Sequence, residues 1–164
     1  MLQRGRYMNK TNVMRVLDQK KAKYTVHEYE GTGAISGKEV AAALGQDERQ
    51  LFKTLVTTGR SKQHYVFMVP VTGELDLKKA AKAAGEKNIE MIKEKELLPL
   101  TGYVHGGCSP IGMKKTFPTF IHRDAADFET IIFNAGKIGY QVQIGLEELA
   151  KVMDFTLADV LKTE

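Results

Sequence analysis

The sequence predicts a single α+β domain in which a mixed, barrel-like β-sheet is flanked by helices. Three observations support this prediction. The chain has 164 residues, of which 43% are hydrophobic and 27% charged, a composition typical of one soluble globular domain with a substantial core. Strand-like and helix-like segments are mixed without the regular strand–helix–strand order of a parallel sheet. No repeat or low-complexity linker divides the chain, so residues 12–164 are expected to form the domain after a flexible leader at residues 1–11.

The first helices are predicted where a capping residue precedes apolar residues at helical spacing. Asn12 is expected to cap the first helix. Ser36 and Glu39 form the capping-box pattern of a second helix, which Gly45 would end. Asp76 is expected to cap a third helix that carries several lysines.

The later elements are predicted from shorter patterns. Residues 93–98 predict a short helix ended by Pro99, residues 146–153 an amphipathic helix, and residues 155–161 a final turn or short helix. Runs rich in β-branched and aromatic residues predict the strands, and the second and third of these would form a hairpin. The predicted strands are residues 24–29, 51–58, 64–69, 89–92, 119–122, 130–133 and 140–144.

The segment from Gly106 to Gly112, with the sequence GGCSPIG, is the first candidate site. Three glycines and one proline in seven residues exclude the middle of a helix or of a central strand. Glycines let a backbone approach a ligand closely and leave N–H groups free to bind an anion or a carbonyl oxygen. Lys114 and Lys115 come directly after it and add positive charge. An ordinary connection between strands explains the same pattern, so the loop needs a chemical partner elsewhere.

Lys53 is the candidate partner. In the strand Leu51-Phe52-Lys53-Thr54-Leu55-Val56 both faces are largely apolar, as expected of a strand that is covered on both sides. A lysine in such a strand either extends its ammonium to an edge or holds it in a pocket with a partner. In a pocket, the ammonium would face a phosphate or a developing oxyanion, with the hydroxyl of Thr54 beside it.

Two further patterns are open to more than one interpretation. Residues 133–139 form a turn of small residues that suits either a plain hairpin or a site. Cys108 with His105 is a candidate thiol nucleophile and base, although the sequence supplies no third group to orient them. The four histidines lack the spacing of metal ligands, and one cysteine does not make a zinc site.

The charge of the chain permits a polyanionic partner. The formal net charge is +4 and the sequence pI is about 9.1. Solvated helix faces and a surface that binds nucleic acid are both consistent with the lysines of the middle of the chain. These are Lys78, Lys79, Lys82, Lys87, Lys93, Lys95, Lys114, Lys115 and Lys137. The single cysteine suits a reducing cytosol, and the sequence shows neither a signal-peptide pattern nor an apolar run as long as a membrane span.

Four blocks of the sequence, in this order, resemble the YbaK/EbsC family of bacterial aminoacyl-tRNA editing proteins. The blocks are Phe52-Lys53-Thr54-Leu55, Leu77-Lys78-Lys79-Ala80-Ala81, the segment from Gly106 to Lys115, and Phe128-Glu129-Thr130-Ile131. This family is typified by Cys-tRNA(Pro) deacylase and is similar to the editing domain inserted in bacterial prolyl-tRNA synthetases. The resemblance covers residues 12–161.

The resemblance implies roles for individual residues. Lys53 matches the family's strand lysine, and with Gly106 it is expected to be catalytic. Expected substrate-binding residues are Tyr29, Thr54, Gly107, Cys108, Ser109, Pro110, Gly112, Asn134, Gly136, Lys137 and Gln141. The chain departs from the common family pattern at Cys108, Asn134, Ala135 and Gln141, which leaves the aminoacyl specificity open.

The implied activity is trans-editing of Cys-tRNA(Pro), in which the cysteinyl thiol attacks its own ester. Implied partners are the acceptor end of aminoacyl-tRNA and prolyl-tRNA synthetase, in the cytoplasm, without a cofactor, a metal or a membrane. Three alternatives stay open: deacylation of another mischarged tRNA such as Ala-tRNA(Pro), a non-catalytic module that binds a nucleotide or tRNA end, and an enzyme that depends on the Cys108 thiol.

Overall fold

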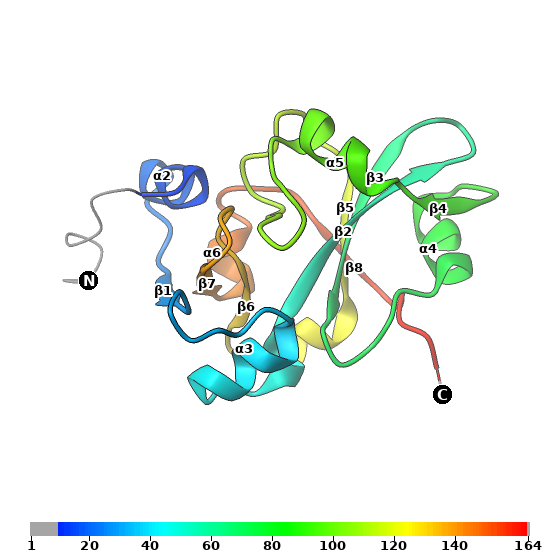
Figure 1. The fold of residues 1–164 in the computed structure, drawn as a ribbon. Coiled ribbons are helices and arrows are strands. Elements are labelled where there is room, and N and C mark those ends of the chain that lie inside the picture. The colour runs from blue at the N-terminus through cyan, green and yellow to red at the C-terminus, as the bar shows by residue number, and fades with distance from the viewer. Residues whose placement is uncertain (1–9, 164) are drawn as a thin grey trace.

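The computed structural model describes residues 10–163, whose strands form two sheets (Figure 1). The helices are α2 (Asn12–Gln19), α3 (Gly37–Leu44), α4 (Leu77–Ala84), α5 (Glu94–Thr101) and α6 (Leu146–Leu149), with 3-10 helices η1 (Glu48–Gln50) and η2 (Arg123–Asp127). The strands are β1 (Thr25–Glu28), β2 (Phe52–Gly59), β3 (His64–Pro70), β4 (Ile89–Met91), β5 (Thr119–His122), β6 (Ile131–Asn134), β7 (Tyr140–Ile144) and β8 (Thr156–Ala158). None of these helices is long and apolar enough to cross a membrane.

The two sheets confirm the predicted α+β class. The first is antiparallel with the order β1-β7-β6. The second has the order β4-β2-β3-β5-β8, in which β2 runs antiparallel to β3 and β4, and β5 runs parallel to β3 and β8. The barrel-like detail of the prediction is wrong. Between the described parts of the two sheets only one bridge forms, from Leu51 to Ile132, and no ladder continues from it to close a barrel.

The apolar core lies on both faces of the five-stranded sheet, because alternate residues of β3 point to opposite sides. Val66 and Met68 belong to the larger cluster, which also contains Phe133 of the first sheet. Phe67 and Val69 belong to a smaller cluster under α4. Cover on both faces was predicted for the strand that contains Lys53, which is β2 of this sheet, and the predicted hairpin of β2 and β3 is confirmed.

The caps of the first helices agree with the sequence, with one exception. The capping box of Ser36 and Glu39 starts α3, and Gly45 ends it with a left-handed φ of 67°. The predicted cap at Asn12 is wrong by one residue. Thr11 caps α2 by accepting from the N–H of Met14 at 3.1 Å, since the amide of Asn12 is used in a tertiary hydrogen bond. Thr11 therefore belongs to the folded part, and residues 1–9 of the predicted leader lie outside the described residues.

Three later predictions are wrong. Pro99 does not end α5 but lies inside it, and the helix continues to Thr101 with Gly102 as its C-cap. The helix predicted at residues 146–153 is limited to α6. Residues 155–161 contain strand β8 in place of a turn or helix, because parallel pairing with β5 overrides the local pattern.

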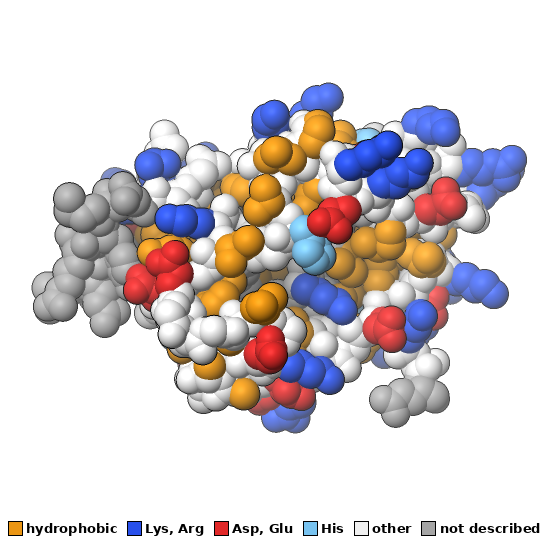
Figure 2. All heavy atoms as spheres, in the orientation of Figure 1, with side chains coloured by type: hydrophobic (Ala, Val, Ile, Leu, Met, Phe, Trp, Pro, Cys, Tyr) orange, Lys and Arg blue, Asp and Glu red, His pale blue; other side chains and the backbone are white. Residues whose placement is uncertain are grey.

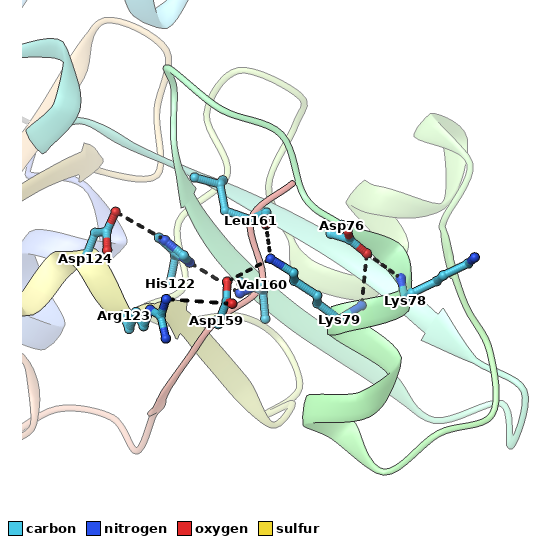
Figure 3. Close-up of polar contacts among 9 residues, drawn as sticks. All are labelled: Asp76, Lys78, Lys79, His122, Arg123, Asp124, Asp159, Val160 and Leu161. Carbon is cyan, nitrogen blue, oxygen red and sulfur yellow. Dashed lines mark hydrogen bonds and ion pairs between the residues drawn. The ribbon is translucent and has the colours of Figure 1, made fainter. Parts of the chain in front are cut away.

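Polar contacts hold the C-terminal segment against α4 and β5 (Figure 3). The ammonium of Lys79 donates to the carbonyl of Leu161 at 2.8 Å and to Asp159 at 3.3 Å. The buried ring of His122 accepts from the N–H of Val160 at 3.3 Å. Lys79 is thus a structural lysine, and its ammonium is not free to bind a polyanion.

Candidate active site

A cavity of about 450 Å³ opens beside the start of β2, where it is walled by the beginning of α3 and by the loop that comes after α5. The elements that surround it can be located in Figure 1. Several residues singled out from the sequence line this cavity, although they come from distant parts of the chain. They are Tyr29, Lys53, Thr54, Gly106, Cys108, Asn134 and Gln141.

The other predicted residues do not line the cavity. They are Gly107, Ser109, Pro110, Gly112, Gly136 and Lys137. Several of them shape the loops around it. The buried hydroxyl of Ser109 accepts from the N–H of Ile111, and Gly136 lies so close to Val13 and Tyr103 that a side chain at this position would collide with them. Their predicted contacts with substrate stay predictions.

Lys53 lies in the first half of β2, where β4 does not pair with the strand and only the bridge from Leu51 to Ile132 connects it to β6 among the described residues. Strand β4 pairs only with residues 57–59 of β2. Lys53 and its neighbour Thr54 both line the cavity. Lys53 is half-buried, and no residue between 10 and 163 forms a hydrogen bond or ion pair with its ammonium. Its charge is therefore available to a ligand.

The hydroxyl of Thr54 is a second unsatisfied group in the cavity wall. Its Oγ1 atom is buried and has no hydrogen-bond partner in the described part of the chain. A buried polar atom without a partner costs about 1–3 kcal/mol, and native proteins usually supply a partner from water or a ligand. Thr54 and Lys53 together give this wall one hydroxyl and one cation that no residue between 10 and 163 binds.

Asn134 joins three segments that meet at the cavity. Its Nδ2 donates to the carbonyl of Gly106 at 2.8 Å and to the hydroxyl of Tyr29 at 3.3 Å. Its Oδ1 accepts from the N–H groups of Gly136 at 2.8 Å and Lys137 at 3.1 Å. The side chain therefore holds the glycine loop and the end of β1 in register with the turn after β6.

The glycine loop presents its backbone differently from the expectation. Gly106 has a left-handed φ of 88°, and its N–H has no partner among residues 10–163. The N–H of Gly107 is not free, because it donates to the carbonyl of Val104 at 2.9 Å. The expectation that both glycines offer N–H groups to a carbonyl is therefore corrected to Gly106 alone. Gly107 is needed for close packing, since an added Cβ would lie 3.2 Å from the backbone nitrogen of Ile138.

Cys108 is poorly suited to be a nucleophile. Its side chain is buried, and burial raises the pKa of the thiol to about 12. The thiolate, which is the reactive form, is therefore scarce at neutral pH. His105 lines the same cavity, but nothing in its surroundings creates the lowered thiol pKa that a Cys-His pair requires.

Sequence reasoning missed other residues of this site. Lys38, in the first turn of α3, lines the cavity, and only its place within the capping box, between Ser36 and Glu39, indicated its position. Gln46 lies behind the wall and donates from Nε2 to Oε1 of the buried Gln141 at 2.8 Å. These residues are 95 positions apart, and no local pattern connects them.

Comparison with known proteins agrees with this geometry. Residues 33–152 match the family model of the aminoacyl-tRNA editing domain. A protein of Enterococcus faecalis assigned as a Cys-tRNA(Pro)/Cys-tRNA(Cys) deacylase, EbsC, is 42% identical over 156 residues, which are 94% of this chain and 95% of the relative.

Two solved structures share the fold. One, assigned as a trans-editing enzyme for prolyl-tRNA synthetase, has a TM-score of 0.81 at 25% identity and covers 93% of this chain and 96% of its own. The other, a hypothetical protein, has a TM-score of 0.84 at 20% identity and covers 92% and 99%. With a family match that spans most of the folded residues and a relative of this identity, the chain belongs to the family of aminoacyl-tRNA editing domains.

Proposed function

We propose that this chain is a trans-editing hydrolase that removes cysteine from Cys-tRNA(Pro). The observation that carries the proposal is that Lys53, Gly106 and Thr54 line one cavity. Among the described residues, nothing binds the ammonium of Lys53, the N–H of Gly106 or the hydroxyl of Thr54. A volume of about 450 Å³ lies within the range of small-molecule sites and suits the aminoacyl end of a tRNA. The name assigned to the relative from Enterococcus faecalis supports the same substrate.

The proposed reaction needs no nucleophile from the protein. The sulfur of the cysteinyl group attacks the ester carbonyl of the same residue, so that a C–S bond forms and the C–O bond to the ribose breaks. The thiol proton ends on the ribose oxygen, which leaves the tRNA uncharged and the cysteine as a cyclic thiolactone. Water then opens the thiolactone to free cysteine. An aminoacyl ester is already activated, so positioning and charge stabilisation supply most of the catalysis.

The residues of the cavity have distinct proposed roles. Lys53 binds the phosphate or ribose of the terminal adenosine or shares the negative charge that develops on the carbonyl oxygen. The N–H of Gly106 donates to that oxygen. Tyr29 lines the pocket against the adenine. Because burial raises the pKa of Cys108, this thiol contributes shape to the site and takes no covalent part in the step.

The proposed setting is the cytoplasm, where aminoacyl-tRNA is made and used. Phosphate contacts from lysines attract tRNA without reading its sequence, so selection of proline tRNA has to come from another source. We infer that prolyl-tRNA synthetase supplies this selection as a partner, in line with the name assigned to the structural neighbour.

Deacylation assays with three substrates test the proposal: Cys-tRNA(Pro), Ala-tRNA(Pro) and Cys-tRNA(Cys). Loss of cysteine from Cys-tRNA(Pro), with alanine retained, is the expected result. Equal loss from Cys-tRNA(Cys) would place the selection of the tRNA outside this chain. Release of alanine from Ala-tRNA(Pro) in place of cysteine would make alanine the preferred amino acid, and it would exclude attack by a substrate thiol because alanine has none. No turnover of any substrate would make the chain a binding module.

A further inference from the structure

The most exposed large hydrophobic side chains of the described residues belong to segments that border the cavity. They are Ile35, Ile138, Leu98 and Val104, which are 87%, 54%, 52% and 48% exposed. We call these four residues the aliphatic rim. The three next in exposure, Leu77, Met91 and Leu157, belong to α4, β4 and β8, and none of these elements lines the cavity.

Each residue of the aliphatic rim belongs to a segment that lines the cavity or contacts a residue that does. Ile35 itself lines the cavity. Leu98 comes directly after the lining residue Leu97, and Val104 directly precedes the lining residue His105. The side chain of Ile138 lies against Gly106, 3.6 Å from the position that a Cβ of this glycine would occupy. Figure 2 shows hydrophobic side chains spread over the face of the molecule between α3 and α5.

Such an arrangement points to a ligand that extends beyond the cavity. Single exposed hydrophobic residues are common on protein surfaces, but a group of them around an opening marks a contact site. These side chains come from four separate segments, so no local sequence feature accounts for their gathering. The cavity interior is sufficient for one aminoacyl-nucleoside, so the rim is left to contact the part of the ligand that lies outside the cavity.

Positive charge accompanies the rim. Lys38 lines the cavity, and Lys137 directly precedes Ile138. Both lysines are exposed, and neither forms an ion pair with a carboxylate in the described range. Proteins bind single-stranded nucleic acid with side chains that pack against the faces of the bases, most often aromatic ones, and with cations that contact the backbone. Here the aliphatic rim would pack against the bases, and Lys38 and Lys137 would contact the backbone.

We propose that the aliphatic rim binds the unpaired nucleotides that precede the terminal adenosine of the aminoacyl-tRNA. This inference rests on the proposed function, in which the terminal adenosine and its amino acid enter the cavity. A protein partner fits the rim less well. Stable protein interfaces are centred on well-packed, often aromatic anchors, and a protein seated on the rim would close the mouth through which the tRNA end has to enter.

The test compares a substrate that reaches the rim with one that does not. The variants Ile138→Ser and Val104→Ser are assayed on cysteinyl-adenosine and on the cysteinyl ester of the trinucleotide CCA. We expect kcat/KM for the trinucleotide ester to fall about five- to tenfold in each variant, the loss that accompanies one aliphatic contact, and kcat/KM for cysteinyl-adenosine to stay unchanged. Met91→Ser removes a comparably exposed side chain away from the cavity and is expected to alter neither.

Two outcomes would overturn the proposal. An equal loss on both substrates would show that the rim only shapes the cavity. The second outcome is that the rim variants keep full activity on the trinucleotide ester and lose activity only when full-length tRNA and prolyl-tRNA synthetase are present. This outcome would assign the rim to a protein partner. Binding of uncharged CCA trinucleotide separates this question from the proposed function, because it is measured without turnover. If the wild type binds the CCA trinucleotide and both rim variants bind it more weakly, the proposed role of the rim is supported even if no substrate is deacylated.

Discussion

Replacement of Asn134 tests whether the geometry of the glycine loop controls activity. Asn134→Ala removes four hydrogen bonds, to Gly106, Tyr29, Gly136 and Lys137. A hydrogen bond of this kind contributes about 0.5–1.5 kcal/mol, and the site is partly open to solvent, so we expect a loss of about 2–4 kcal/mol in the free energy of unfolding.

Asn134→Asp separates the two halves of this network. A carboxylate still accepts from the N–H groups of Gly136 and Lys137, but it has no N–H to donate to the carbonyl of Gly106. We therefore expect a loss of only about 1–2 kcal/mol in stability. Because the released loop carries the N–H of Gly106, kcat/KM should fall by about 10- to 100-fold, the effect of misplacing a catalytic group by about 1 Å.

Urea denaturation measures the stability of both variants, and deacylation of Cys-tRNA(Pro) measures their activity. Gln63→Asp, an exposed residue in the turn between β2 and β3, is the matched control for the added charge. Wild-type activity of Asn134→Asp in a folded protein would refute the reasoning, because the loop would then hold its position without the bond from Asn134 to Gly106.

Three further predictions concern other side chains. Thr54→Val removes the buried hydroxyl that has no partner among the described residues. We expect the free energy of unfolding to rise by about 1 kcal/mol and deacylation to slow about tenfold. A lower free energy of unfolding in urea would show that the hydroxyl has a hydrogen-bond partner. Cys108→Ala should keep wild-type activity, and the wild-type thiol should resist iodoacetamide at pH 8. The folded thiol keeps its proton up to about pH 12, whereas the unfolded thiol loses it near pH 9. The free energy of unfolding of the wild type should therefore fall by about 1.4 kcal/mol per pH unit in this interval. Cys108→Ala should show a weaker fall. Lys79→Met should lower the free energy of unfolding by about 1 kcal/mol, because its bonds to Asp159 and Leu161 are lost, and should leave deacylation unchanged. A fall in kcat/KM would instead place this lysine on the tRNA-binding surface.

The sequence predicted elements whose signals are local. The capping box at Ser36 and the glycine stop at Gly45 define α3, since both act through hydrogen bonds within one turn. The β2–β3 hairpin was predicted for the same reason, because its two strands flank a short turn. Elements that depend on distant partners were missed. Strand β8 forms only because β5 offers it an edge, and the cap of α2 shifts to Thr11 because the amide of Asn12 bonds to Gly112.

The site shows the same division. A lysine in an apolar strand was recognisable as a candidate from its own neighbours. That Lys53 lines a cavity depends on segments far away in the sequence, since Tyr29, Gly106 and Asn134 form other parts of the same wall. The bond from Gln46 to Gln141 joins residues 95 positions apart, so no local pattern predicts it. The N–H of Gly107 donates to Val104 within one turn, whose conformation the glycine-rich pattern alone does not specify.

Substitution of Lys53 tests the central claim most directly. Lys53→Ala removes the ammonium, and Lys53→Met keeps most of the apolar stem that packs along β2. Lys62→Met, at the exposed turn of the same hairpin, is the matched control. We predict that both Lys53 variants stay folded and lose about 100- to 1000-fold in the rate of cysteine release from Cys-tRNA(Pro), the usual loss on removal of one electrostatic donor, while Lys62→Met keeps the wild-type rate. Cysteine release at the wild-type rate by folded Lys53→Met would remove the ammonium from the mechanism and contradict this account of the site.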